Sequence, residues 1–510
     1  MGLNGLSWAL TLNFVLMNIK TRCRDARLTA ILVAFCLFPL AEALAQPENP
    51  AQACRITPEA IVTLRDPFFG TPAIWDAAFG TKDKLTQFSG AVTLPNKNLL
   101  VVGEDLDQRY KPLEHILVEL NNRSRVVDEK RYPAKTNERS SGVLATKKGY
   151  IVSSNISGGK RDNEKRIRLA WYDDARNFKR EMILQDSTYD YESLGLSKSV
   201  DGNGFLAIVH AVSREDVNDQ HGMLFRVSDS GSVLWKRAYR PGIPNQIYGV
   251  SPADDRHYIA GGRIRVEDGR MGGWILKLND DGTIVWQNTY PRGNYAVFRS
   301  GYVKPGDQAG DHYVVTGQVM PIGEMPGAVW VLEVDSLGIP VWQRYIRAKD
   351  YDLDPRSIHA YGDGRISVMA NAKPVADQGS PHIRLLTLSP RGGLSVDEAY
   401  LTGRQAVAQQ MIQGWSGERI VIADIETGGK VSDSGRKIEL ITEAIERQER
   451  EKKMAAQENL FGPPDPTPEQ VAQIAQSIPE EILHKGWVFV ATALDPYDDP
   501  CVINPVKPAE

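Results

Sequence analysis

Short apolar runs alternate with polar turns along most of the chain, and one order of elements keeps returning. Three segments, 222–239, 273–290 and 329–346, align without gaps through a tryptophan. Each reads as an apolar strand, a polar turn and a second strand. A glycine stands four residues before each tryptophan, where a hairpin turn requires a positive φ. The pairs are Gly231 and Trp235, Gly282 and Trp286, and Gly338 and Trp342. These segments therefore predict antiparallel hairpins.

Two further strand series precede the hairpins. The longer one lies at 99–104, 150–155, 205–210, 258–263, 313–318, 365–370 and 419–424. A shorter one lies just ahead, at 89–94, 141–146, 193–198, 248–253, 300–305, 357–362 and 410–415. Four strands in about 50 residues, repeated, are typical of a propeller blade. The pattern predicts an all-β, seven-bladed β-propeller. A helical solenoid is excluded because no window has a sustained 3.6-residue period, and a β-helix, the rival fold, needs no such hairpins.

Both ends of the chain contribute to the last predicted blade. Residues 487–494 read as its third strand, and residues 73–80 resemble the tryptophan strands. We therefore expect the N-terminal segment to supply the outer strand and the ring to be closed by both termini. Such closure leaves no open edge between the first and last blades.

A long insertion, 430–485, interrupts this last blade. Residues 436–458 are rich in helix formers, and residues 467–485 restart after Pro463, Pro464 and Pro466 with Thr467 as a helix cap. The sequence predicts a helical insertion that covers the loop face or reaches a partner. A solvated excursion is the alternative, because charge runs often mean only solvation.

The hairpins carry one family resemblance. Their order of apolar strand, acidic turn with glycine, tryptophan and tyrosine resembles bacterial secreted β-propellers of the quinoprotein-like and "KLD-DG-W" repeat groups. The resemblance implies a fold and no activity. Quinoprotein blades carry an Ala-x-Asp/Asn-x-x-Thr-Gly pattern and calcium-binding acids that this sequence lacks, so no quinone and no other cofactor is expected.

The N-terminal region reads as a secretory leader. Basic residues 20–27 precede an apolar run from Leu28 to Leu40, and a small-residue site ends at Ala45. The run is shorter than the roughly 20 residues that span a bilayer. We expect residues 1–45 to be a signal peptide, with Met17 an alternative start, and residues 46–510 to form one periplasmic or secreted propeller domain with no stable membrane insertion. A retained anchor is the alternative.

Composition adds two expectations. The net charge of -4 over 510 residues, with 24% charged residues, favours no nucleic-acid partner. Of four cysteines, only Cys54 and Cys501 follow the leader. In an oxidising compartment such a pair predicts a disulfide, which would join the two ends of the ring. Two free thiols or a metal site are the alternatives, although two cysteines supply too few zinc ligands.

The longer connections between strands predict the binding face. The polar connections fall on one face of a propeller, and binding residues concentrate on such loops. The candidate binding residues on them are Tyr110, Arg161, Tyr189, Tyr191, Arg265, Tyr295, Tyr351, Asp352 and Asp354. We expect them to bind a protein or a glycan of the cell envelope.

No catalytic or metal-binding motif is present. The histidines lack zincin spacing, and neither a nucleophile elbow nor a phosphate loop occurs. His257 and His312 occupy equivalent repeat positions, which favours a structural role. The leading hypothesis is a binding or scaffold protein without catalytic or metal-ligating residues. The alternative, a hydrolase or lyase acting on a polymer, requires a tight cluster of His, Asp, Glu and Tyr near the axis.

Overall fold

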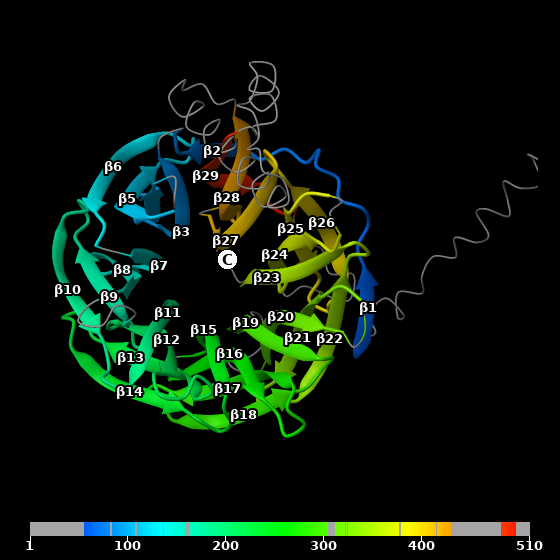
Figure 1. Cartoon of the computed structure of the whole chain (residues 1–510). Helices are drawn as coiled ribbons and strands as arrows, with labels where there is room; N and C mark the ends of the chain where they lie inside the picture. The colour runs from blue at the N-terminus through cyan, green and yellow to red at the C-terminus, as the bar shows by residue number, and fades with distance from the viewer. Residues whose placement is uncertain are drawn as a thin grey trace, which may run out of the picture. The chain divides into compact units, whose positions relative to one another are not determined.

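A computed structural model describes most of the chain after residue 55. The described residues are 56–81, 84–107, 110–135, 137–158, 164–254, 256–303, 312–321, 323, 325–376, 379–414, 416–429 and 481–495. They belong to one compact unit in which every regular element is a β-strand, arranged around a central axis (Figure 1). No helix capable of crossing a membrane occurs within these ranges.

Five sheets contain four strands each. They are β3 (Leu85–Thr93), β4 (Leu99–Leu106), β5 (Pro112–Leu120) and β6 (Val126–Pro133); β7 (Glu138–Thr146), β8 (Gly149–Ser157), β9 (Lys165–Tyr172) and β10 (Phe178–Leu184); β11 (Tyr189–Lys198), β12 (Phe205–Ser213), β13 (Gln220–Val227) and β14 (Val233–Tyr239); β23 (Tyr351–Ala360), β24 (Ile366–Pro374), β25 (His382–Leu388) and β26 (Leu394–Tyr400); and β27 (Gln405–Gln413), β28 (Arg419–Gly429), β29 (Glu481–Ala491) and β2 (Trp75–Phe79). In each, the first-named strand lies nearest the axis (Figure 1).

The sixth sheet contains nine strands. They are β15 (Asn245–Pro252), β16 (His257–Arg265), β17 (Met271–Asn279), β18 (Ile284–Tyr290), β19 (Tyr295–Val303), β20 (His312–Met320), β21 (Ala328–Asp335), β22 (Pro340–Arg347) and β1 (Glu59–Thr63). A single parallel pair, Met271 with Tyr295, joins β17 to β19 and so connects the β15–β18 set to the β19–β22 set. Strand β1 then adds to β22 in parallel.

The prediction of seven separate blades is therefore wrong. Hydrogen bonding makes five separate four-stranded blades, and the rest of the ring is one continuous sheet. The cause is local: the connection between β18 and β19 brings Tyr295 beside Met271, where their backbones pair. A repeat pattern in the sequence predicts strands and turns, but it does not predict a backbone pairing between two neighbouring four-stranded groups.

The repeated tryptophans fix each hairpin turn to the next. Gly282 has a φ of 78° and lies against the Trp235 ring, whose Nε1 donates to the Asp280 carbonyl at 3.2 Å. Trp286 lies in the same way over Gly338 and donates to the Ser336 carbonyl at 2.8 Å. Each tryptophan thus packs on the turn of the following repeat, which explains why the sequence repeats glycine and tryptophan together.

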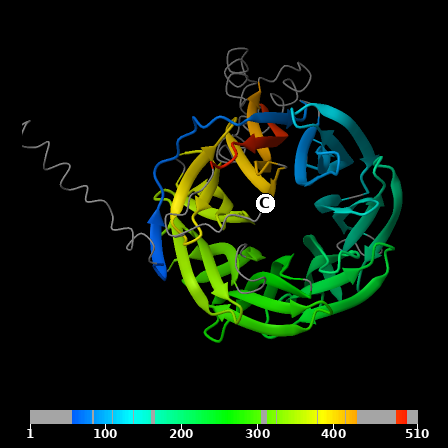
Figure 2. The same ribbon diagram turned by 180° about the vertical axis from the view of Figure 1, so that it is seen from behind.

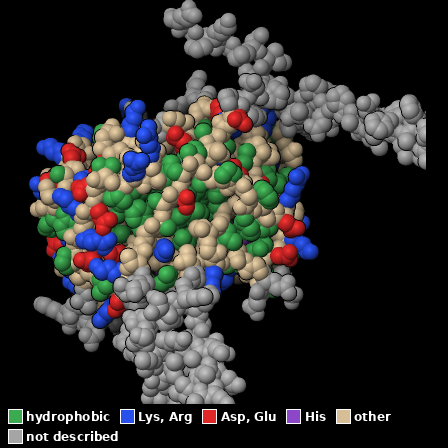
Figure 3. Space-filling model, turned by 90° about the horizontal axis from the view of Figure 1, so that it is seen from above, with side chains coloured by type: hydrophobic (Ala, Val, Ile, Leu, Met, Phe, Trp, Pro, Cys, Tyr) green, Lys and Arg blue, Asp and Glu red, His purple; other side chains and the backbone are tan. Residues whose placement is uncertain are grey.

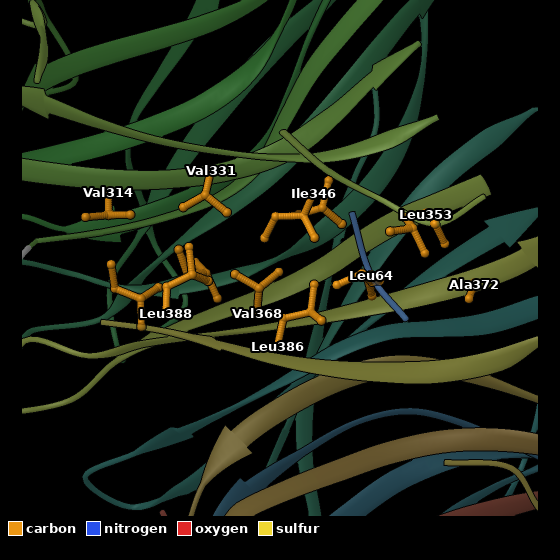
Figure 4. Close-up of a cluster of buried hydrophobic side chains, with 14 of the residues drawn as sticks. Leu64, Val314, Val331, Ile346, Leu353, Val368, Ala372, Leu386 and Leu388 are labelled. Carbon is orange, nitrogen blue, oxygen red and sulfur yellow. The ribbon is translucent and has the colours of Figure 1, made fainter. Parts of the chain in front are cut away.

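The N-terminal segment bridges three sheets. After β1, Leu64 enters the core between β20–β22 and β23–β25, where Figure 4 shows it among Leu353, Val368 and Leu386. Strand β2 then pairs antiparallel with β29, so the expectation that residues 73–80 supply an outer strand to the last blade is confirmed. From behind, β1 and β2 both lie on the outside of the ring (Figure 2).

The closing blade packs on its neighbour by apolar contact. Phe88 and Val101 on one side meet Ile422 and Val488 on the other in one buried cluster.

Figure 3 looks onto the wall at the top of Figure 1 and shows hydrophobic side chains across its middle, with charged side chains toward the margins.

The end of the predicted helical insertion is a β-strand, so the prediction of a helix there is wrong. Residues 481–485, expected to end its second helix, belong to β29, where Lys485 pairs with Ile425 and Glu481 with Gly429. Helix formers are overridden there because the edge of β28 is available for pairing. The described residues contain no helix, and residues 430–480 lie outside them, as do the leader, Cys54, Cys501 and Arg161.

Candidate functional site

A β-bulge interrupts every innermost strand at an equivalent position. One residue is skipped in the pairing of each inner strand with its neighbour, and a bulge of this kind re-aims a side chain. The skipped residues are Ser89, Ser141, Leu194, Tyr248, Arg299, Arg356 and Gln409. We call them the bulge ring.

The bulge ring lines a cavity on the axis. This axial cavity has a volume of about 670 Å³, and every member of the bulge ring contributes to its wall. The wall also carries Lys198, His359 and Gln410. None of the described residues that line it is an Asp or a Glu. Burial lowers the pKa of His359, so its ring is neutral at pH 7. The charged groups facing the cavity are therefore cationic.

Polar side chains of the second strands hold the bulges in place. One residue per second strand lies at the same register, two residues before the bulge on the partner strand: Glu104, Asn155, His210, Arg263, Gln318, Asn371 and Asp424. We call these the latch residues, because several bond to the inner strand of the neighbouring blade.

The two asparagine latches show the interaction fully. Asn371 accepts from the Ala408 amide at 2.7 Å and donates to the Ala408 carbonyl at 3.0 Å. Asn155 makes the same pair of bonds with Ser193, at 2.7 and 3.2 Å. Ala408 and Ser193 directly precede bulge residues and lie on strands at the edge of their sheets, so each latch satisfies edge backbone groups beside a bulge.

Two latches are carboxyl groups. Asp424 accepts from the Phe88 amide at 2.9 Å and from Gln409 Nε2 at 2.8 Å, and burial raises its pKa to about 7. Glu104 accepts from the Ser140 hydroxyl at 2.9 Å, and burial raises its pKa too. Asp424 therefore bonds directly across the junction of the last and first blades.

Two of the predicted binding residues meet in one cluster beside the cavity. Asp354 lies 3.0 Å from Arg299 Nε and 2.9 Å from Arg356 Nη2. Tyr295 accepts a hydrogen bond from Arg263 Nη1 at 2.9 Å. Tyr248 joins these groups, because its ring lies 4.9 Å from the Arg299 guanidinium and 5.7 Å from that of Arg263. We call these six residues the arginine cluster.

Two other predicted binding residues, Tyr351 and Asp352, lie in β23 beside Asp354 and contact neighbouring segments of the fold. Asp352 accepts from the Gly327 amide at 2.6 Å, which ties β23 to the connection between β20 and β21. Tyr351 packs edge-on against His382 with ring centroids 4.7 Å apart. Neither lines the axial cavity.

Tyr110 and Tyr191 line a second pocket of about 400 Å³, together with Arg139 and Lys165. Tyr110 packs edge-on on His484, with ring centroids 5.0 Å apart and its hydroxyl bonded to the imidazole. Tyr191 is almost fully buried and donates to Asp186 at 3.1 Å. This pocket is separate in its lining from the axial cavity.

The last two described candidates lie elsewhere. Tyr189 donates to Asp219 at 2.8 Å and faces the Arg240 guanidinium at 5.3 Å. Arg265 is exposed, and its backbone amide donates to the Pro244 carbonyl at 3.0 Å. The eight described candidates thus do not form one site.

Sequence reasoning missed the bulge ring and the latches. A signal was available for the latches, because six of the seven segments in the longer strand series end in a polar residue, and Asn371 directly follows the remaining one. The bulge residues carry no common chemistry, and nothing in their identity marks the skipped position. Among the described residues, no group of three or more His, Cys, Asp or Glu could hold a metal ion.

Comparisons with known proteins extend to the fold only. No protein-family model and no curated protein matches the chain. Among solved structures, it is similar to a Penicillium chrysogenum alpha-L-arabinanase complexed with arabinobiose, at 11% identity over 64% of this chain and 97% of that one, with a TM-score of 0.37. It is also similar to the parainfluenza virus 5 hemagglutinin-neuraminidase ectodomain, at 8% identity over 76% and 98%, TM-score 0.36.

A puromycin hydrolase structure matches at 14% identity over 71% of this chain and 53% of that one, TM-score 0.39, so the chain spans about half its length. Likeness at this level carries no argument about activity. The expected resemblance to β-propellers is confirmed at the level of the fold; no match bears on the closer resemblance to bacterial secreted repeat proteins.

Proposed function

We propose that this chain is a binding protein of the cell envelope that takes its ligand into the axial cavity. The observation that carries the proposal is the bulge ring, in which each inner strand departs from regular pairing to direct one side chain at a shared cavity. Latch residues hold that departure in place, so the site is preorganised, as ligand sites usually are. A volume of about 670 Å³ suits a small ligand or a protruding group of a larger one.

The lining favours binding over hydrolysis. A polymer-cleaving hydrolase or lyase on this axis needs a proton donor and a proton acceptor in contact with the scissile bond. The described wall offers a neutral histidine, His359, and no carboxylate. Its arginines, hydroxyls and amides are groups that hold a ligand by hydrogen bonds.

The location in the envelope rests on the leader-like residues 1–45. Expression in a Gram-negative host, followed by N-terminal sequencing of the exported protein, should give a mature chain that begins at or near Gln46. An intact N-terminus on a membrane-embedded product would contradict this part of the proposal without affecting the binding site.

A cavity-filling variant tests the site. Ala145 lines the cavity, and Ala145→Trp should obstruct it, whereas Ala145→Ser should not. Envelope extracts are passed over immobilised wild type and both variants, after circular dichroism confirms equal strand content. The proposal expects one ligand to be retained by wild type and Ala145→Ser and lost from Ala145→Trp. Equal retention by all three would place the binding site outside the cavity.

A further inference from the structure

The bulge ring is chemically asymmetric. Tyr248, Arg299 and Arg356 are consecutive members and bring bulk and charge to one arc. Ser89 and Ser141 bring small hydroxyls to the opposite arc. A ligand in the axial cavity therefore meets a cationic wall at Arg299 and Arg356 and a neutral polar wall at Ser89 and Ser141, with Lys198 at the end of β11 as a further cation of the described lining.

The cationic wall carries more positive charge than its carboxylate neutralises. Asp354 is shared by Arg299 and Arg356 at 3.0 and 2.9 Å. Arg299 Nε and Asp354 Oδ1 are both buried, and although close they make no aligned hydrogen bond. One carboxylate is therefore shared by two guanidinium groups, and its contact with Arg299 is not a well-aligned hydrogen bond.

Aromatic rings keep these guanidinium groups in place. The Arg299 guanidinium lies 4.9 Å from the Tyr248 ring centroid, and Arg263 lies 5.7 Å from the centroids of Tyr248 and Tyr295. Burial raises the pKa of Tyr248 to about 12, so its hydroxyl is neutral at pH 7 and removes no positive charge. The arginine cluster thus holds three guanidinium groups and one carboxylate in fixed orientations.

The neutral wall suits hydroxyl groups. The Ser89 hydroxyl donates to the Val102 carbonyl at 3.1 Å, and the Ser141 hydroxyl lies 3.2 Å from the Ser153 carbonyl. Because the Ser89 proton is used by the Val102 carbonyl, the Ser89 oxygen can accept from a ligand. The Ser141 hydroxyl also lies 2.9 Å from the Ser153 hydroxyl, and either of the two can donate to the other. Gln409 donates to Asp424, which leaves its amide oxygen as a further acceptor.

We propose that the axial cavity binds an acidic glycan fragment, with a sugar carboxylate on Arg299 and Arg356 and the sugar hydroxyls on the serine side. This inference rests on the proposed function and names the class of its ligand. Guanidinium groups match a carboxylate in a bidentate manner, and the excess charge beside the cavity is the part of the wall that a neutral sugar would leave unsatisfied. Hydrogen-bond acceptors on the opposite wall favour a sugar over an inorganic anion, because a sugar has hydroxyl groups that can donate to them.

Calorimetry on the mature protein tests the proposal with defined probes. These are the trisaccharide of galacturonic acid, the trisaccharide of galactose, inorganic phosphate, and an acidic hexapeptide of Asp and Glu. Arg356→Gln removes a cation of the arginine cluster, Arg356→Lys keeps the charge, and Arg265→Gln removes an exposed arginine that does not line the cavity. Thermal unfolding verifies that each variant is folded.

The acidic trisaccharide should bind the wild type, with an affinity at least tenfold above that of the neutral one and falling with added salt. Arg356→Gln should lose at least tenfold, Arg356→Lys less, and Arg265→Gln nothing. Equal binding of both trisaccharides, lost only in Ala145→Trp, would overturn the acidic ligand and leave cavity binding intact. Tighter binding of phosphate or of the hexapeptide would overturn the glycan, and failure of every probe together with equal extract retention by Ala145→Trp would overturn both proposals.

Discussion

At the scale of single residues, the contact between a repeat tryptophan and the next turn makes a sharp prediction. A Cβ on Gly282 would lie 2.7 Å from the Trp235 ring, at a φ of 78°. Gly202 has a φ of 67° with nothing within 4 Å, so it is a matched control for the backbone strain alone. Gly282→Ala should lower the free energy of unfolding by about 3 kcal/mol and Gly202→Ala by about 1 kcal/mol. Equal losses in denaturant titrations would show that the tryptophan contact does not matter.

The buried Asp424 predicts a pH dependence. Its pKa is raised from 3.8 to about 7 in the folded chain, so the folded state binds a proton that the unfolded state has already lost. Its contribution to stability is full below about pH 4, declines as the pH rises toward 7, and is constant above it. Asp424→Asn should flatten this part of the profile of melting temperature against pH, whereas Asp280→Asn, in an exposed turn, should not. Identical slopes for wild type and Asp424→Asn would refute the assignment.

At the scale of elements, the insertion between β28 and β29 predicts a tolerated deletion. Gly429 and Glu481 are paired at the end of the two strands, so a short Gly/Ser turn can connect them directly in place of residues 430–480. That variant should keep its strand content and melt within a few degrees of the wild type, since closure entropy varies only with the logarithm of loop length. Extending the deletion to 485 also removes the Tyr110–His484 contact and should melt lower. Loss of fold in the shorter deletion would mean that the insertion belongs to the core.

The strands were largely predictable, but the site was not. Short apolar runs and turn glycines such as Gly231 locate the hairpins because they reflect local chemistry. The helix expected to end at Lys485 was wrong because pairing with Ile425 depends on a strand about 60 residues earlier. The position of Arg299 and Arg356 at the cavity was not predicted, because a bulge depends on the pairing of two strands and cannot be identified from the sequence of one strand alone.

At the scale of the whole molecule, the expected bond between Cys54 and Cys501 is still a prediction. Both lie outside the described residues. Peptide mapping of exported protein without reduction should find them joined, and Cys501→Ser should lower the melting temperature without changing strand content, because the chain-entropy model gives upwards of about 4 kcal/mol for a loop of this size if the bond is unstrained. Recovery of both thiols alkylated in unreduced protein would contradict the bond.

The pairing of β2 with β29 also has a consequence for the order of folding. Asp76 and Trp487, whose side chains bond at 3.1 Å, are 411 residues apart in the chain. Strand β2 leaves the ribosome early, yet its partner is among the last segments made. The edge of β2 therefore stays unpaired through nearly all of synthesis. Distant contacts of this kind slow folding, and an unpaired strand edge invites pairing with other chains. Truncated chains that end before residue 481 should therefore be the aggregating species during expression, whereas full-length chains are protected once β29 is complete.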